Sequence, residues 1–159
     1  VIQPHGGSQE QGYQYSWTRD IPTPIVKQII DHYKNDYTII HIKHKNQITY
    51  PDTLQALDGY RSIAILLQLS KKRLLIDSFA QHLAYALNLP STVCWVNTKP
   101  EVFGYDIHDN IKSKPWTKIP NDNNASYTIF NLSEDTSNIP YNDLNEIFNV
   151  NKLISSLDK

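Results

Sequence analysis

The sequence predicts an α/β fold in which helices cover a parallel sheet. Short apolar runs that suit buried strands alternate with amphipathic segments of helical period along the first two thirds of the chain. This alternation favours parallel strands joined by right-handed crossovers. The chain has 159 residues, 40% of them hydrophobic, which is enough for one good core but marginal for two. We therefore expect one domain.

The first elements follow from local patterns. Val1 to Gly7 begins with apolar residues and ends in two glycines, as a core strand entering a loop does. Residues 24–35 place apolar side chains on one face at helical spacing, which predicts a helix. Residues 37–42 form a β-branched run between polar segments, which predicts a buried strand.

Two further helices and two strands are predicted in the middle of the chain. Residues 60–70 have helical spacing, and the cations at 71–73 complement the negative end of a helix dipole. The apolar residues 74–76 predict a short strand and the stripe along 79–87 a third helix. Residues 92–96 complete the alternation as another strand.

After residue 111 the pattern weakens. A possible edge strand spans residues 127–130, and a final helix over 144–157 is expected to pack across the body. We assign residues 1–111 to the core and residues 112–159 to a C-terminal extension of the same domain.

Composition excludes several classes. The formal net charge is -1 and shows no basic stripe along the chain, so nucleic acid is not an expected partner. Apolar segments such as 63–69 fall far short of the roughly 20 residues that cross a bilayer, and no signal peptide opens the chain. The single cysteine, Cys94, lies in an apolar run and suits a buried thiol. We expect a soluble, cytoplasmic protein.

The turn after residue 76 is the best candidate for a binding site. A strand ends there in Asp77-Ser78 where a helix must begin. The free backbone N–H groups of Ser78, Phe79 and Ala80 would carry the positive end of the helix dipole and hold a diphosphate. Ligands of open α/β sheets bind at such carboxyl ends. The alternative is that Asp77 or Ser78 only caps the helix.

Other polar residues carry weaker signals. His82 borders the apolar stripe of its helix, where it is either a satisfied core histidine or a ligand contact. Gly6-Gly7 would let backbone amides approach a phosphate but lacks the Gly-Lys-Ser/Thr ending of a P-loop, so an ordinary turn is the stronger interpretation. His41 and His44 lack a cysteine or carboxylate partner set, and no metal site is expected.

The segment Asp77-Ser-Phe-Ala-Gln-His-Leu-Ala-Tyr-Ala-Leu87, followed by Pro90, a strand and Lys99-Pro-Glu-Val-Phe-Gly104, resembles glycosyltransferase family nine, the heptosyltransferase-like group. The similarity covers roughly residues 1–111. It implies a Rossmann-like three-layer domain resembling the C-terminal half of a bacterial GT-B glycosyltransferase. In that family this half binds the nucleotide diphosphate sugar donor. The acceptor site and catalytic base belong chiefly to an N-terminal domain, which we expect to be missing from this chain.

The resemblance also implies roles for individual residues. The amides of Ser78, Phe79 and Ala80 would cradle the diphosphate, Asp77 would orient the sugar or the loop, and His82 would support the turn. The implied activity is hexosyl or heptosyl transfer in cell-surface glycan or lipopolysaccharide-type synthesis, without a metal or other cofactor. The enzyme would act at the inner face of the membrane, with peripheral association only through its acceptor. The catalytic residues remain unassigned.

The sequence departs from the family pattern at several positions. The family usually has glycine where Phe79 stands, and a side chain there restricts close approach by phosphate. It also tends to place a lysine before the tryptophan where this chain has Tyr15-Ser-Trp17; Arg19 is a possible substitute. The nucleotide base would lie near Leu54 and Leu57, although such apolar residues are more often core.

These departures leave two other functions open. One is a non-catalytic module that keeps the fold and binds a nucleotide, a glycan or a protein partner. The other is a different enzyme on the same architecture, such as a nucleotide-sugar epimerase, because a fold does not fix its chemistry.

Overall fold

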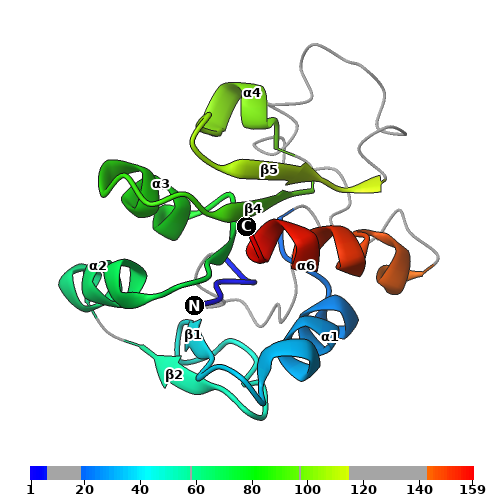
Figure 1. The fold of residues 1–159 in the computed structure, drawn as a ribbon, viewed down its shortest axis with the longest axis horizontal. Coiled ribbons are helices and arrows are strands. Elements are labelled where there is room, and N and C mark those ends of the chain that lie inside the picture. The colour runs from blue at the N-terminus through cyan, green and yellow to red at the C-terminus, as the bar shows by residue number, and fades with distance from the viewer. Residues whose placement is uncertain (7–18, 58, 97, 115–142) are drawn as a thin grey trace.

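Figure 1 shows the computed structural model, which describes residues 1–6, 19–57, 59–96, 98–114 and 143–159. Helices and short strands alternate along the chain. The elements are α1 (Thr23–Tyr33), β1 (Ile40–Ile42), β2 (Leu54–Ala56), α2 (Tyr60–Leu69), β3 (Leu74–Ile76), α3 (Phe79–Ala86), β4 (Thr92–Trp95), α4 (Pro100–Phe103), β5 (Asp109–Lys112), the 3-10 turn η2 (Leu144–Glu146) and α6 (Val150–Leu157).

The strands pair in parallel throughout the described ranges. β1 pairs with β2, and β3, β4 and β5 form a second group in that order. Ile2 joins the two groups, because it forms parallel bridges to His41 and to Leu74. Its N–H donates to the Ile40 carbonyl at 2.8 Å, and the N–H of Gln3 donates to the Leu74 carbonyl at 2.9 Å. The first residues therefore lie between β1 and β3, which confirms the expected α/β class with parallel strands.

Helices cover both sides of these strands. In Figure 1, α1 and α6 lie on one side, and α2 and α3 lie on the other. Leu74 and Ile76 of β3 belong to the core cluster that contains α1 and α6, whereas Leu75 belongs to the cluster with α2 and α3. This division follows from the strand period of two, which sends successive side chains to opposite faces.

Most element bounds lie close to those expected from the sequence. β3 spans the predicted residues, and α1, α2 and α3 end within two residues of the predicted helices. The predicted strand over residues 37–42 is shorter, because β1 begins only at Ile40 while Tyr37 and Thr38 are exposed. The elements β2, α4 and β5 were not predicted. The predicted strand over 127–130 lies outside the described residues.

The expected helix over residues 144–157 is interrupted. The turn η2 is followed by α6, which begins after Asn149. The Asn149 side chain accepts a hydrogen bond from the Lys152 N–H at 3.2 Å and so caps the new helix. Leu153 and Leu157 then reach the core cluster beside α1. None of the helices in the described part of the chain has the length and apolar character that crossing a bilayer requires.

Candidate functional site

A cleft of about 380 Å³ opens beside the carboxyl ends of four neighbouring parallel segments. Gln3 and His5 reach it from residues 1–6, here called the first segment, which lies between β1 and β3. Lys43 follows β1, Leu57 follows β2, and Ser78 follows β3. Loops after parallel strands meet at one edge of a sheet, which brings these residues together from distant parts of the sequence.

Both polar and apolar residues line the cleft. The described lining residues include no Asp or Glu, whereas Lys43 supplies a positive charge. Its surroundings therefore favour an anion over a cation. The polar lining residues are Gln3, His5, Lys43, His44, Gln47 and Ser78, and the apolar ones include Ile42, Ala56, Leu57, Tyr60, Ile63 and Phe79.

The first turn of α3 faces this cleft. Ser78 precedes the helix in an extended conformation and makes no side-chain capping bond; its hydroxyl instead accepts from Gln3 Nε2 at 3.4 Å. The N–H groups of Ser78, Phe79 and Ala80 donate to no atom of the described residues. Ser78 and Phe79 line the cleft, while the Ala80 side chain is buried in the core. The helix start can therefore offer free donors and its dipole to an anion.

Gln3, which lines the same cleft, carries an acceptor without a partner. Its side chain is only 8% exposed, and its Oε1 is buried without a hydrogen-bond partner among the described residues. A buried carboxamide oxygen without a partner is costly, and a ligand O–H or N–H would satisfy it. Gln3 and the start of α3 together suit a ligand that is both anionic and hydroxyl-bearing.

Asp77 lies behind this surface. It is half-buried at the end of β3 and does not line the cleft. Burial raises the pKa of its carboxyl, and this effect is opposed by the Thr98 hydroxyl and by the charges of His82 and Arg19. Its position suits support of the turn before α3.

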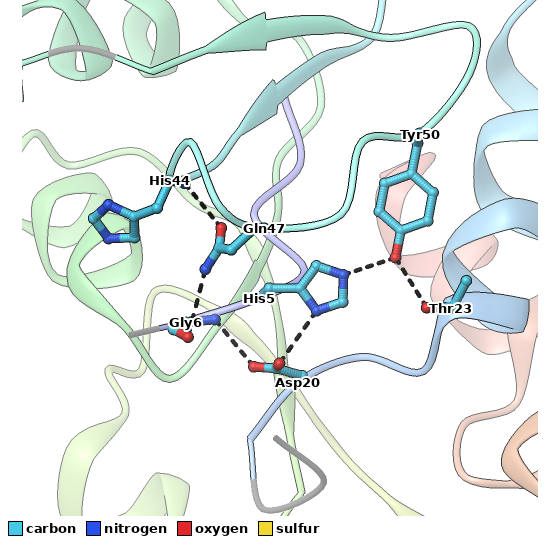
Figure 2. A network of polar contacts seen from close by, with 7 residues as sticks. All are labelled: His5, Gly6, Asp20, Thr23, His44, Gln47 and Tyr50. Carbon is cyan, nitrogen blue, oxygen red and sulfur yellow. Dashed lines mark hydrogen bonds and ion pairs between the residues drawn. The ribbon is translucent and has the colours of Figure 1, made fainter. Parts of the chain in front are cut away.

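A buried polar network fixes the first segment beside the cleft (Figure 2). His5 Nδ1 lies 3.2 Å from Asp20 Oδ2, and His5 Nε2 lies 2.7 Å from the Tyr50 hydroxyl. Tyr50 in turn donates to Thr23 Oγ1 at 3.4 Å, and Asp20 Oδ1 accepts from the Gly6 N–H at 3.0 Å. Burial raises the pKa of Tyr50 to about 12, and the Asp20 charge acts in the same direction. Tyr50 is therefore held as the neutral phenol.

Both the N–H and the carbonyl of Gly6 form hydrogen bonds within the protein. Its N–H donates to Asp20, and its carbonyl accepts from Gln47 Nε2 at 3.5 Å. The Gly6 N–H is thus already engaged by protein and does not point a free donor at a phosphate. A Cβ at this position would lie 2.7 Å from Arg19 Nε, so a larger residue would require the Arg19 side chain to shift. Gly7 lies outside the described residues.

Arg19 packs against the end of the first segment. Its Nε is buried without a hydrogen-bond partner among the described residues, and its charge is felt at Asp77. The charge of Arg19 therefore reaches the turn before α3, but Arg19 is not among the residues that line the cleft. Residues 15–17, where the family has its lysine, lie outside the described residues.

His82, Leu54 and Leu57 are not core residues, which was the alternative to a ligand contact for each of them. His82 is exposed, bonds through Nδ1 to the Tyr105 hydroxyl at 2.9 Å, and is not among the residues that line the cleft. Leu54 and Leu57 are 61% and 50% exposed, so neither is a core residue. Leu57 lines the cleft, whereas Leu54 does not.

Sequence reasoning missed the partners that fix the first segment. Asp20, Gln47 and Tyr50 are far from His5 in sequence and share no motif with it. The only available signal was an acidic residue, Asp20, four positions before the predicted start of the first helix at residue 24. The spacing of residues along the sequence cannot predict which distant residues contact a loop that follows a central strand.

Neither a metal centre nor a match to a known protein identifies this site. In the described ranges, no group of three or more His, Cys, Asp or Glu side chains is placed to hold a metal ion. No protein-family model, curated protein or solved structure matches this chain.

Proposed function

We propose that this chain is the domain of a glycosyltransferase that binds a nucleotide diphosphate sugar, built on a Rossmann-like fold of the GT-B kind. The observation that carries the proposal is the start of α3, whose three free N–H groups meet a cleft in which none of the described lining residues is acidic. Free amides and a helix dipole are the usual protein ligands of a diphosphate.

The strand order supports the same proposal. Across the sheet the order is β2, β1, first segment, β3, β4, β5. The chain therefore builds the sheet outwards in one direction from the first segment and in the opposite direction from β3. Doubly wound α/β proteins bind dinucleotides and related ligands at such a reversal, outside the carboxyl ends of the strands. Gln3 and Ser78 stand on the two sides of that point and are hydrogen-bonded to each other.

The same residues suit the chemistry of donor activation. In glycosyl transfer the bond from the sugar to the nucleotide diphosphate breaks, and negative charge grows on the leaving phosphate. The α3 amides and the Arg19 cation would stabilise that charge in place of a metal ion. Gln3 Oε1 would accept from a donor hydroxyl. The described residues that line the cleft include no carboxylate base, so we assign the base to another domain.

Calorimetric titration with ADP, GDP, UDP and their sugar conjugates tests the proposal. We expect saturable binding of one nucleotide family. His44 lines the cleft and is exposed, and a His44→Glu change should weaken binding at least about tenfold by placing a negative charge beside the diphosphate.

The matched control is Lys27→Gln, which changes the net charge by the same amount on the exposed face of α1. It should leave binding nearly unchanged. Equal weakening by the two variants would show a general charge effect, and absence of nucleotide binding by folded protein would overturn the proposal.

A second candidate is a module that binds the same ligands without catalysis. It is favoured by Phe79, which occupies the first position of α3 and lines the cleft beside the free amides. Incubation of the complete protein with labelled donor separates the two. Transfer or donor hydrolysis supports the enzyme, whereas tight binding without turnover supports the module.

A further inference from the structure

Two aromatic side chains form an exposed lip on the cleft. Phe79 begins α3 and Tyr60 begins α2, and both line the cleft. Their ring centroids are 4.8 Å apart at an interplanar angle of 56°. Tyr60 remains 74% exposed and Phe79 37% exposed, and Leu57 beside them is half exposed. Much apolar surface is therefore left in contact with water at the mouth of the cleft.

The lip is adjacent to the proposed anion site. Phe79 contributes both an aromatic side chain to the cleft and one of the free N–H groups at the start of α3. A ligand whose phosphates meet those amides therefore has its neighbouring group beside Tyr60 and Phe79. Gln3 and His5 lie deeper in the cleft, since both of these residues are buried.

These positions separate three kinds of ligand group. The amides take an anion, Gln3 takes a hydroxyl or amine donor, and the lip takes a flat apolar surface. Planar rings stack on aromatic side chains with a gain of about 1–3 kcal/mol per base in nucleic-acid complexes. Inorganic pyrophosphate or a simple sugar phosphate has no group that would cover the lip.

We infer that Tyr60 and Phe79 are specificity-determining residues that stack on the planar base of the ligand and make the cleft prefer nucleoside diphosphates over pyrophosphate. The inference rests on the proposed function, because it takes the phosphates to lie at the start of α3. It adds a role for Phe79, whose ring would contact the base of the ligand at this lip.

The test compares ligands that share the diphosphate but differ in the ring. Calorimetry measures the dissociation constants of ADP, GDP, UDP and pyrophosphate for the wild type, Phe79→Leu and Tyr60→Leu. Each variant removes a ring and keeps an apolar side chain. We expect each to weaken the tightest nucleoside diphosphate about tenfold while pyrophosphate binding stays the same.

Two controls separate the ring from other effects. Tyr60→Phe keeps the ring and loses only the hydroxyl, so it should bind like the wild type. Tyr85→Leu removes an exposed aromatic side chain from the same helix, away from the cleft, where Tyr85 stacks on Tyr105 at 3.7 Å. It should leave all four dissociation constants unchanged. Circular dichroism confirms that each variant is folded.

The outcomes distinguish this inference from the proposed function. If nucleoside diphosphates and pyrophosphate bind equally well, or if both leucine variants keep the wild-type preference, the stacking role is overturned while the anion site stands. If folded wild-type protein binds none of the four ligands, both proposals fall. A loss of preference confined to Phe79→Leu and Tyr60→Leu supports the assignment.

Discussion

Asp20 is the residue on which the buried network most depends. Its side chain is fully buried and accepts from the Gly6 N–H while facing His5. Asp20→Ala leaves both groups buried without this partner, so we expect a loss of about 3 kcal/mol in the free energy of unfolding. Urea denaturation measures it. The control Asp31→Ala removes an exposed carboxylate paired with Lys34 and should change little. Similar losses in both variants would contradict the importance of the network.

His41 is expected to make stability depend on pH. It is fully buried, and both ring nitrogens lack partners among the described residues. Burial, followed by the charges of His5 and Lys43, lowers its pKa to about 3. The unfolded chain takes up this proton below about pH 6.5 and the folded chain does not. Stability is therefore full above that pH and is lost as pH falls towards 3, by up to about 1.4 kcal/mol per pH unit.

Urea denaturation of wild type and His41→Leu between pH 7 and pH 5 measures this effect. The substitution places an apolar side chain of similar size at this buried position and removes the titrating group. The stability of the variant should fall less steeply with acid than that of the wild type. Parallel curves would show that His41 takes up its proton in the folded state.

At the scale of the element, α6 depends on its capping residue. The Asn149 side chain accepts from the Lys152 N–H at the start of the helix. Asn149→Ala should destabilise the protein by about 1 kcal/mol in thermal or urea unfolding. Asn151→Ala is the control, because Asn151 lies exposed inside the helix, where alanine is the better helix former. The cap is unimportant if the two variants are equally stable.

The sequence predicted those elements whose pattern is local and strong. β3 stands as three apolar residues between Arg73 and Asp77, and the amphipathic stripe of α3 begins directly after Ser78. The same stripe and turn gave the anion-site prediction. β2 escaped prediction because Leu54–Ala56 is largely exposed at the edge of the strands, and β5 because it begins with Asp109-Asn110, residues that strands seldom contain. Helix signals run through residues 144–157, so the Asn149 break was hidden.

Only the part of the candidate site that lies within one short stretch of sequence could be predicted. The half of the site that we propose for anion binding lies within one strand-turn-helix segment and can be predicted from the local sequence. Its other half depends on Gln3, His5 and Lys43, which come together only through strand pairing. A pattern along the chain carries no information on which distant strand ends become neighbours.

At the scale of the whole molecule, the first segment joins the two strand groups. The Ile2 N–H donates to Ile40, so Ile2→Pro removes a hydrogen bond from the centre of the sheet. We expect the variant to lose most of its cooperative thermal transition. The comparison variant, Gln55→Pro, changes the edge strand β2. The hydrogen bonds of β2 to the β1 side involve the Leu54 N–H, which donates to Ile39, and the Ala56 carbonyl, which accepts from Lys43. That variant should keep a cooperative transition, and equal damage from both would argue against a central role for Ile2.

The central position of the first segment also has a consequence for how the chain folds. Ile2 pairs with His41 and Leu74, and the Val1 amine donates to the Lys72 carbonyl across 71 positions. Contacts between such distant positions slow folding, because a long loop must close before they form. During synthesis the segment emerges before β1 and β3 exist. It must wait as an unpaired strand until both have left the ribosome, and this interval is when the nascent chain is most exposed to pairing with the wrong partner.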